Sequence, residues 1–425
     1  MIILILIGSP VFGTEITAPK PNVILITISS LRSDHVSCLG YPRNTTPNFD
    51  TFSESSTLFS SAYATSSWMM PAAGSIFTSL YPTEHHATDI NRQISANAVT
   101  LGEILQKDGY FCAGFCCNPR LSSENGFARG FHYYDDYSVE LIVNNLSSTS
   151  DDFDINTTRT NDLINDAAIR WLENNSHQPF FLFVHFYDNH WDYLPPAGYD
   201  TLYDRDYRGP LTGNAISKEP LYSNRPPDRD VDHLIALYDG QVRRTDEDLG
   251  DLMEYLKQKK LFDSSIIIIC GDHGEQFYEH GHTSHHGIYD ELLHVPLAVH
   301  LPTAKRVTVF DGLVSGIDIM PTILDYTSID LPTNLRGVSL RKAIEEGTAV
   351  RDFVFAEYTG GAVEDSFALR TKVYKVIQTD KEMFYFDLAS DPSELRMLNL
   401  ENAGEDILNL AGKLQKLRDG FQSNR

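Results

Sequence analysis

The chain has 425 residues, of which 42% are hydrophobic and 11% aromatic. This composition supplies a sizeable core and excludes a globally disordered protein. The 58 acidic residues outnumber the 34 basic ones and give a formal net charge of -24. Nucleic-acid binding needs a clustered basic face that neutralises phosphates, so we expect no nucleic-acid partner.

The N-terminal segment, residues 1–19, begins with an apolar run that has no basic start. The run is shorter than the ~18 residues of a membrane span, so we expect no transmembrane span and interpret the segment as the remnant of a signal peptide. Four sequons, a triplet that also recurs by chance, would suit a secreted protein; they lie at Asn44, Asn145, Asn156 and Asn174. The compartment stays open between a secreted or cell-surface location and the cytoplasm.

Three unbroken apolar runs predict strands that are buried on both faces of a parallel sheet; they are residues 22–28, 180–186 and 265–270. Ser29 follows the first run, and Asp188 and His190 follow the second. Asp272 and His273 follow the third. Ligands of open α/β sheets bind at the carboxyl ends of the strands, so this convergence predicts a site.

Apolar residues recur at helical spacing in two segments. Residues 163–172 precede the second apolar run, and residues 249–256 precede the third. The alternation of strands and helices predicts a doubly wound α/β core over residues 20–350. Residues 195–230 are rich in Pro, Gly, Tyr and Asp and show no period, which indicates a long surface excursion. A lid over the site is one role for it.

After residue 350 the pattern changes to short alternating runs separated by turns. These runs predict a small antiparallel sheet followed by a helix; they are residues 352–357, 372–377 and 383–388, with the helix near 407–417. We therefore expect a C-terminal α+β subdomain, residues 351–425, packed on the core.

The five cysteines do not form the pattern of a disulfide framework, because their number is odd and Cys116 and Cys117 are adjacent. Cys112 lies four residues before Cys116, but no second pair at zinc-like spacing accompanies it. We expect buried cysteines that act as small hydrophobic residues.

Several short segments together resemble the sulfatase family of the alkaline phosphatase superfamily; they are residues 31–35, 66–82, 271–275 and 293–297. The resemblance runs from about Lys20 to the C-terminus. It implies an α/β fold with a large mixed, mostly parallel sheet sandwiched by helices, and a small C-terminal antiparallel subdomain. It also implies hydrolysis of a sulfuric ester by a metal-activated nucleophile.

In that family the nucleophile is a formylglycine made from Cys or Ser, or a Thr that serves directly. This chain has Met69 at the position. A thioether has no proton to lose and is a poor ligand for a hard metal, so we expect no formylglycine and impaired or lost catalysis. Three nearby serines would have to move by a turn or more to replace it; they are Ser66, Ser67 and Ser75.

The resemblance assigns metal binding to Asp272 and His273, which offer one carboxylate and one neutral nitrogen. This mixed pair suits calcium, manganese or zinc about equally. Ser29 stands where the family has an Asp, and a hydroxyl binds a divalent cation more weakly than a carboxylate. With Met69 also changed, about half of the expected protein ligands are missing, so we expect a degenerate metal site.

The resemblance also gives roles to residues around the ester. His190 would bind the ester or protonate the leaving group, and His286 is a second catalytic candidate among the histidines of residues 280–286. His185 and Asp188 would contact substrate. Pro71 suits the first position of a helix whose free N–H groups attract an anion.

Three functions remain open from the sequence. The first is a sulfuric ester hydrolase with impaired catalysis, acting on a sulfate or phosphate ester of a small molecule or glycan. The second is a non-catalytic pseudoenzyme that binds an anionic glycan or a protein partner. The third is a phosphate or phosphonate ester hydrolase. The oligomeric state cannot be derived from the residues.

Overall fold

The computed structural model describes nine stretches of the chain, which are residues 20–88, 90–136, 160–190, 192–214, 216, 218, 221–302, 308–359 and 364–422. The apolar segment 1–19 and the sequons at Asn145 and Asn156 lie outside the described residues. The signal-peptide interpretation therefore stays a prediction. Within the described part of the chain, no helix is long and apolar enough to span a membrane.

The central strand of the molecule is β1 (Asn22–Ile28), and it lies between two parallel neighbours. These are β5 (Phe180–Phe186) and β6 (Ser265–Gly271). Every residue of the three strands is buried. A strand covered on both faces needs apolar side chains at odd and even positions alike, which is the reason the unbroken runs predicted these strands.

The other strands extend this sheet on both sides. β9 (His294–His300) pairs antiparallel with β6 and with β2 (Thr57–Tyr63), so the sheet is mixed. The remaining members are short and parallel to their neighbours: β3 (Phe111–Cys116), β4 (Tyr133–Asp135), β10 (Val309–Phe310) and β11 (Val314–Ser315). The order is β10-β2-β9-β6-β1-β5-β3-β4, with β11 also on β2, which confirms the expected mixed, mostly parallel sheet.

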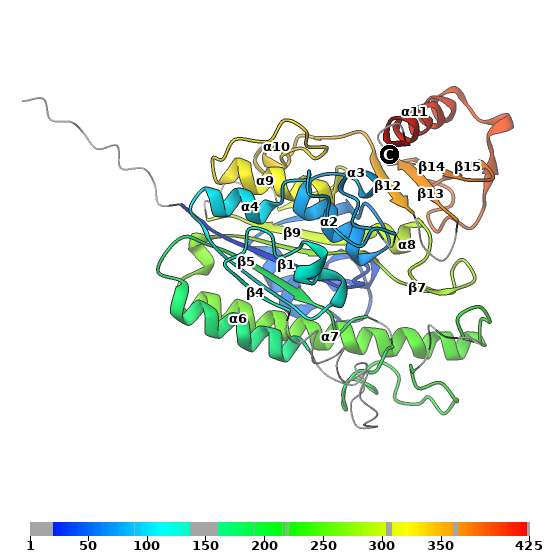
Figure 1. Ribbon diagram of the computed structural model, residues 1–425. Coiled ribbons are helices and arrows are strands. Elements are labelled where there is room, and N and C mark those ends of the chain that lie inside the picture. The colour runs from blue at the N-terminus through cyan, green and yellow to red at the C-terminus, as the bar shows by residue number, and fades with distance from the viewer. Residues whose placement is uncertain are drawn as a thin grey trace, which may run out of the picture.

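Helices cover both faces of the sheet (Figure 1). One face holds α1 (Pro47–Glu54), α6 (Asn161–Asn175) and α7 (Asp228–Gln258). The other holds α2 (Met69–Thr78), α4 (Leu101–Lys107), α9 (Ile319–Tyr326) and α10 (Arg341–Glu346). Side chains of β1 alternate between the two layers, since Ile24 and Ile26 pack in the core with α7 whereas Val23 and Leu25 pack in the core with α2.

The C-terminal part forms a separate antiparallel sheet beside the main one (Figure 1). Its strands, in order, are β12 (Val354–Tyr358), β13 (Ser366–Arg370), β14 (Tyr374–Thr379), β15 (Met383–Asp387) and β16 (Leu398–Asn399). The helix α11 (Glu405–Gln422) packs on it. The small antiparallel sheet and the closing helix were predicted, but β13 and β16 were not.

Two sequence expectations change in detail. α7 begins at Asp228, so the irregular excursion ends before residue 230, and acidic residues in the first helical turn favour this start. The lid role of the excursion stays a prediction. All five cysteines are free thiols, and the four other than Cys38 are buried, which confirms that no disulfide framework exists.

A buried carboxylate joins the two helices α1 and α7. Asp246 of α7 accepts hydrogen bonds from the backbone N–H groups of Asn48 and Phe49, each at 2.8 Å. These groups belong to the first turn of α1, where no intrahelical acceptor exists. Burial raises the pKa of Asp246 to about 6, and the carboxylate replaces water as the cap of the helix.

Replacing this carboxylate tests its contribution. We expect Asp246→Ala to lower the free energy of unfolding by about 2 kcal/mol, because two buried N–H groups lose their acceptor. Urea unfolding at pH 7.5 measures the change. Asp251→Ala is the matched control, since Asp251 is exposed on the same helix, and it should change stability by less than about 0.5 kcal/mol. Equal effects of the two variants would contradict the capping role.

Candidate active site

The carboxyl ends of β1, β5 and β6 bring the predicted polar residues together. The N–H of Ser29 donates to the carbonyl of Phe186 at 2.8 Å, and the N–H of Asp272 donates to the carbonyl of Ile28 at 3.2 Å. The N–H of Ser30 donates to Oδ1 of Asp272 at 3.0 Å. The turn after β6 is therefore fixed directly against the turn after β1.

Asp272 and His273 are buried and keep two atoms without partners. Oδ1 of Asp272 accepts from its neighbour's N–H at 2.6 Å, and Nδ1 of His273 lies 2.8 Å from the carbonyl of Gly274. Oδ2 of Asp272 and Nε2 of His273 have no hydrogen-bond partner among the described residues. A cation would use such a carboxylate oxygen and ring nitrogen as two of its ligands.

The other ligands of a hard-metal site are missing from this cluster. Ser29 and Ser30 present buried hydroxyls, and the turn after β6 holds two buried carboxylates, Asp272 and Glu275. Glu275 lies against His285, with its Oε2 3.5 Å from Nδ1 of that ring. Calcium takes six to eight oxygen ligands, and magnesium or manganese also favours several. Within the described ranges, no group of three or more His, Cys, Asp or Glu is arranged to hold a metal ion. The residues present do not fit the hard-metal site that the family would have.

His185 lies on β5, beneath the same turns. Its Nδ1 is 2.8 Å from Oγ1 of Thr27 on β1, and its Nε2 has no partner in the described part of the chain. Burial lowers the pKa of His185 to about 4, and the negative charge of Asp272 only partly opposes that shift. The ring is therefore neutral at physiological pH and part of the interior. The substrate contact expected for it stays a prediction.

Helix α2 begins at Met69, which places Pro71 at the third helical position instead of the first. The difference is tolerated because the first four N–H groups of a helix have no intrahelical acceptor, so a Pro at any of the early positions removes no bond. The N–H groups that lack an intrahelical acceptor at this end are consequently those of Met69 and Met70. The anion contact expected near Pro71 stays a prediction.

A pocket of about 190 Å³ opens at this helix start. Met69 and Met70, only 4% and 3% exposed, line it. His190 lines it as well, with its ring stacked on Tyr187 at 4.8 Å between centroids. The complete lining is Trp68, Met69, Met70, Asn118, Pro119, Arg120, Tyr187 and His190. Sequence reasoning named Met69 and His190 but missed Trp68 and Arg120.

His285 links the pocket to the metal turn. Its ring lies 4.7 Å from the ring of Trp68, 5.3 Å from His190 and 4.7 Å from His273, measured between centroids. Burial and the neighbouring histidines lower the pKa of His285 well below its usual range, so it stays neutral. The sequence grouped His285 with three other loop histidines and could not single it out.

His286, the second catalytic candidate, faces the C-terminal sheet. Its Nδ1 lies 3.0 Å from the hydroxyl of Tyr358 on β12, and its ring is 5.9 Å from that of Trp68. Tyr358 was missed because it is 72 residues away in the chain and no local pattern marks such a contact. The catalytic role of His286 stays a prediction.

Asp188, expected to contact substrate, is engaged at the start of α6. Its Oδ1 accepts from the N–H and the hydroxyl of Thr160 at 3.0 and 2.7 Å, and its Oδ2 accepts from the N–H of Asn161 at 3.2 Å. This is the arrangement of a helix cap supplied from a distant residue. The substrate role of Asp188 stays a prediction, and it is absent from the lining of the pocket at α2.

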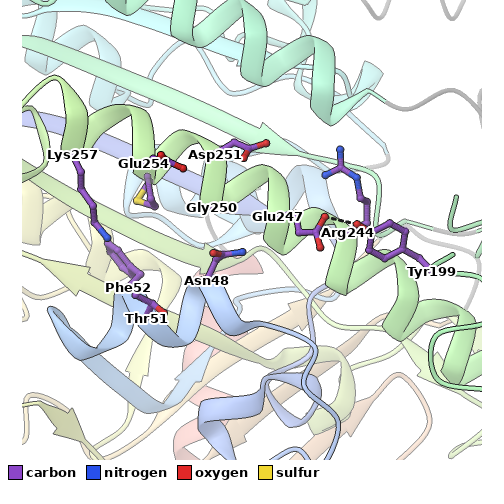
Figure 2. A pocket seen from close by; sticks show the side chains of 11 residues that line it. Asn48, Thr51, Phe52, Tyr199, Arg244, Glu247, Gly250, Asp251, Glu254 and Lys257 are labelled. Carbon is purple, nitrogen blue, oxygen red and sulfur yellow. Dashed lines mark hydrogen bonds between the residues drawn. The ribbon is translucent and has the colours of Figure 1, made fainter. Parts of the chain in front are cut away.

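A larger groove of about 630 Å³ lies between α1 and α7 (Figure 2). Tyr199 donates its hydroxyl hydrogen to Glu247 at one end, and Lys257 stands at the other (Figure 2). Its walls contain none of the predicted site residues. The pocket at the start of α2 is therefore the candidate site, although it is the smaller of the two.

The fold and the residues at its strand ends define a protein of the alkaline phosphatase superfamily. The family model described as Sulfatase matches residues 21–329. A second, described as N-sulphoglucosamine sulphohydrolase, C-terminal, matches residues 278–420. The chain belongs to the sulfatase family.

Similar proteins span most of the chain. An arylsulfatase of Clostridium perfringens is 27% identical, with 91% of this chain and 92% of that protein covered. An N-acetylglucosamine-6-O-sulfatase of Bacteroides thetaiotaomicron is 23% identical, with 88% and 82% covered. The resemblance seen in short segments is thus one of whole chains.

Two solved structures show the same fold. BT4656 in complex with its substrate D-glucosamine-2-N,6-O-disulfate superposes with a TM-score of 0.77, at 20% identity and with 95% of this chain and 99% of that chain covered. A phosphonate monoester hydrolase of Agrobacterium radiobacter gives a TM-score of 0.78, at 21% identity and with 95% and 96% covered.

A buried histidine, His85, packs against the first turns of α2. Nδ1 of His85 accepts the N–H of Ala87 at 3.0 Å, which assigns the ring proton to Nε2. This Nε2 lies 3.1 Å from the carbonyl of Pro71. A Cβ on Gly74 would come within 2.6 Å of the ring, so glycine is what lets the ring lie against the helix. Burial lowers the pKa of His85 to about 3.

This histidine should make the protein sensitive to acid. The unfolded chain binds a proton at this ring below about pH 6.5, whereas the folded chain binds it only near pH 3. The stability contribution is therefore complete above pH 6.5 and is lost as the pH falls, by up to about 1.4 kcal/mol per pH unit. His85→Gln keeps a donor for Pro71 and cannot be protonated, so its stability should fall less between pH 6.5 and pH 4.5.

Urea unfolding at several pH values measures that slope. His177→Gln, at an exposed position, is the control and should keep the wild-type slope. An unchanged slope in His85→Gln would show that the acid sensitivity arises elsewhere.

Proposed function

We propose that this member of the sulfatase family has lost ester hydrolysis and binds an anionic sugar, a sulfated saccharide, in the pocket at the start of α2. The observation that carries the proposal is Met69, which lines this pocket at the first position of the helix. Hydrolysis by this family needs an attacking oxygen at that place. A thioether supplies none.

Other nucleophiles are poorly placed to substitute. Ser66, Ser67 and Ser75 are at most 1% exposed, and the lining of the pocket includes none of them. Ser75 lies six residues after Met69 along α2, with its Oγ 3.2 Å from Nε2 of His85. The cluster around Asp272 and His273 adds no hard-metal site that would activate water. Loss of catalysis is the consistent interpretation of all these replacements.

The pocket retains what an anionic sugar needs. Trp68 and Tyr187 offer aromatic faces for a sugar ring, and apolar walls with a few polar groups are typical of ligand pockets. Arg120 brings a guanidinium suited to an oxyanion. The N–H groups at the start of α2 add positive potential. BT4656, which has the same fold, was solved with its substrate D-glucosamine-2-N,6-O-disulfate, a sugar of this class.

Loss of catalysis can be measured on the purified chain. We expect wild-type protein to hydrolyse p-nitrophenyl sulfate and phosphate no faster than buffer, and to retain no divalent metal after dialysis. Ser29→Asp/Met69→Thr restores one carboxylate and one hydroxyl, so metal retention should appear in this variant. Wild-type turnover that Asp272→Ala abolishes would overturn the proposal and would favour a sulfate or phosphate ester hydrolase instead.

Binding requires its own test. We expect D-glucosamine-2-N,6-O-disulfate to bind in isothermal titration calorimetry, and Arg120→Ala to raise the Kd about tenfold, since a charge-assisted contact is lost. Arg170→Ala, on the exposed surface of α6, should leave the Kd unchanged. Equal affinity for unsulfated glucosamine would contradict recognition of the sulfate groups.

A further inference from the structure

Residues 278–286, called here the histidine loop, include strand β8 (Thr283–Ser284), which pairs antiparallel with β7 (Gln276–Phe277). They lead from the metal turn towards α8 (Asp290–Leu293). His285 of this loop lies next to Trp68 of the pocket, and His280 reaches the C-terminal subdomain. The loop thus contacts both the pocket and the subdomain.

Both ring nitrogens of His280 face atoms that can only accept hydrogen bonds. Nδ1 lies 2.7 Å from Oε1 of Glu291 on α8. Nε2 lies 3.0 Å from the backbone carbonyl oxygen of Glu394 in the subdomain. A neutral imidazole has one N–H and can satisfy only one of them, whereas an imidazolium donates to both. The geometry therefore requires two protons on this ring.

We propose that a doubly protonated His280 fastens the histidine loop to the C-terminal subdomain, and that loss of one proton as the pH rises releases the loop from Glu394. This pH-dependent release concerns only the position of the histidine loop. It goes beyond the proposed binding function and holds whether or not the pocket takes a sulfated sugar.

The acceptor on the subdomain is itself held firmly. Lys375 of β14 is fully buried and lies 2.8 Å from the carboxylate of Glu394 and 2.9 Å from that of Asp290. The N–H of Asp290 donates to Glu394, and Arg370 donates to Asp290 at 2.8 Å. These contacts fix the side chain of Glu394, the residue whose carbonyl oxygen faces His280.

The remaining groups around the ring favour its charge. Burial alone would lower the pKa of His280, but the hydrogen bond and charge of Glu291 outweigh it and raise the pKa above its usual value near 6.5. Tyr289 stacks on the ring at 3.5 Å between centroids, and Glu279 is paired with Arg32. The stabilisation is complete below about pH 6.5 and is lost as the pH rises through the raised pKa.

A second group titrates in the same region and must be separated. Burial raises the pKa of Glu394 to about 7, against the pull of Lys375. A carboxyl with a raised pKa also destabilises the fold as the pH rises. Global unfolding alone therefore cannot distinguish the two, and the experiment must observe the His280 ring and the loop directly.

The experiment combines NMR of the histidine rings with hydrogen exchange in the full chain without ligand. At pH 6 we expect both His280 ring nitrogens protonated, with a titration midpoint above the usual histidine value near 6.5. Amide protection in residues 278–288, corrected for intrinsic exchange, should fall about tenfold between pH 6 and pH 9, as one charge-assisted hydrogen bond is lost. Other buried loops should keep their protection.

Three variants decide the cause. His280→Gln cannot donate at both positions, so its loop should exchange fast already at pH 6 and lose the pH dependence. His177→Gln should behave as wild type. Glu291→Gln should lower the His280 midpoint. A singly protonated ring at pH 6, or a wild-type pH dependence of exchange in His280→Gln, would overturn the proposal. Because neither readout uses ligand or turnover, these results are independent of the binding function.

Discussion

The structure depends on the parallel packing of β1 between β5 and β6. Three fully buried strands that run the same way end at the same edge, and there the chain must turn back through polar residues. The turns after β1 and β6 satisfy each other, through Ser30 and Asp272. Everything at the candidate site, including the start of α2 and the histidine loop, is built around this edge.

This edge of the sheet is stable without a bound cation. Clustered carboxylates repel one another in a buried site unless a cation neutralises them. Here Ser29 and Ser30 are neutral, and Asp272 accepts two backbone N–H groups, so the turns do not require a metal charge for stability. Met69 belongs to the apolar cluster of α2 that also contains Met70 and Ala73. Ser29 and Met69 are thus side chains that the interior accepts, which is consistent with the proposed loss of catalysis.

The sequence predicted the elements whose cause is local. Residues 22–28 and 180–186 coincide with β1 and β5 because burial on both faces leaves an unbroken apolar run. β13 was not predicted, although it has the same length of five residues as β12 and β15, which were. The sequence predicted that the site lies at the carboxyl edge of the sheet, near the segments 66–82 and 271–275. It did not predict the contact between His286 and Tyr358, because that contact depends on tertiary packing. The roles assigned to single residues remain predictions for the same reason.

The C-terminal subdomain contacts the loop that lies next to the candidate site. Tyr358 contacts His286 and the carbonyl of Glu394 faces His280, so two points of the subdomain position the histidine loop. The second family model begins at residue 278, where that loop begins, and continues to residue 420. The contacts of His286 and His280 join the loop to the subdomain, and the boundary at residue 350 stays a prediction. Whatever ligand the pocket takes, the loop that borders it is held from the C-terminal side.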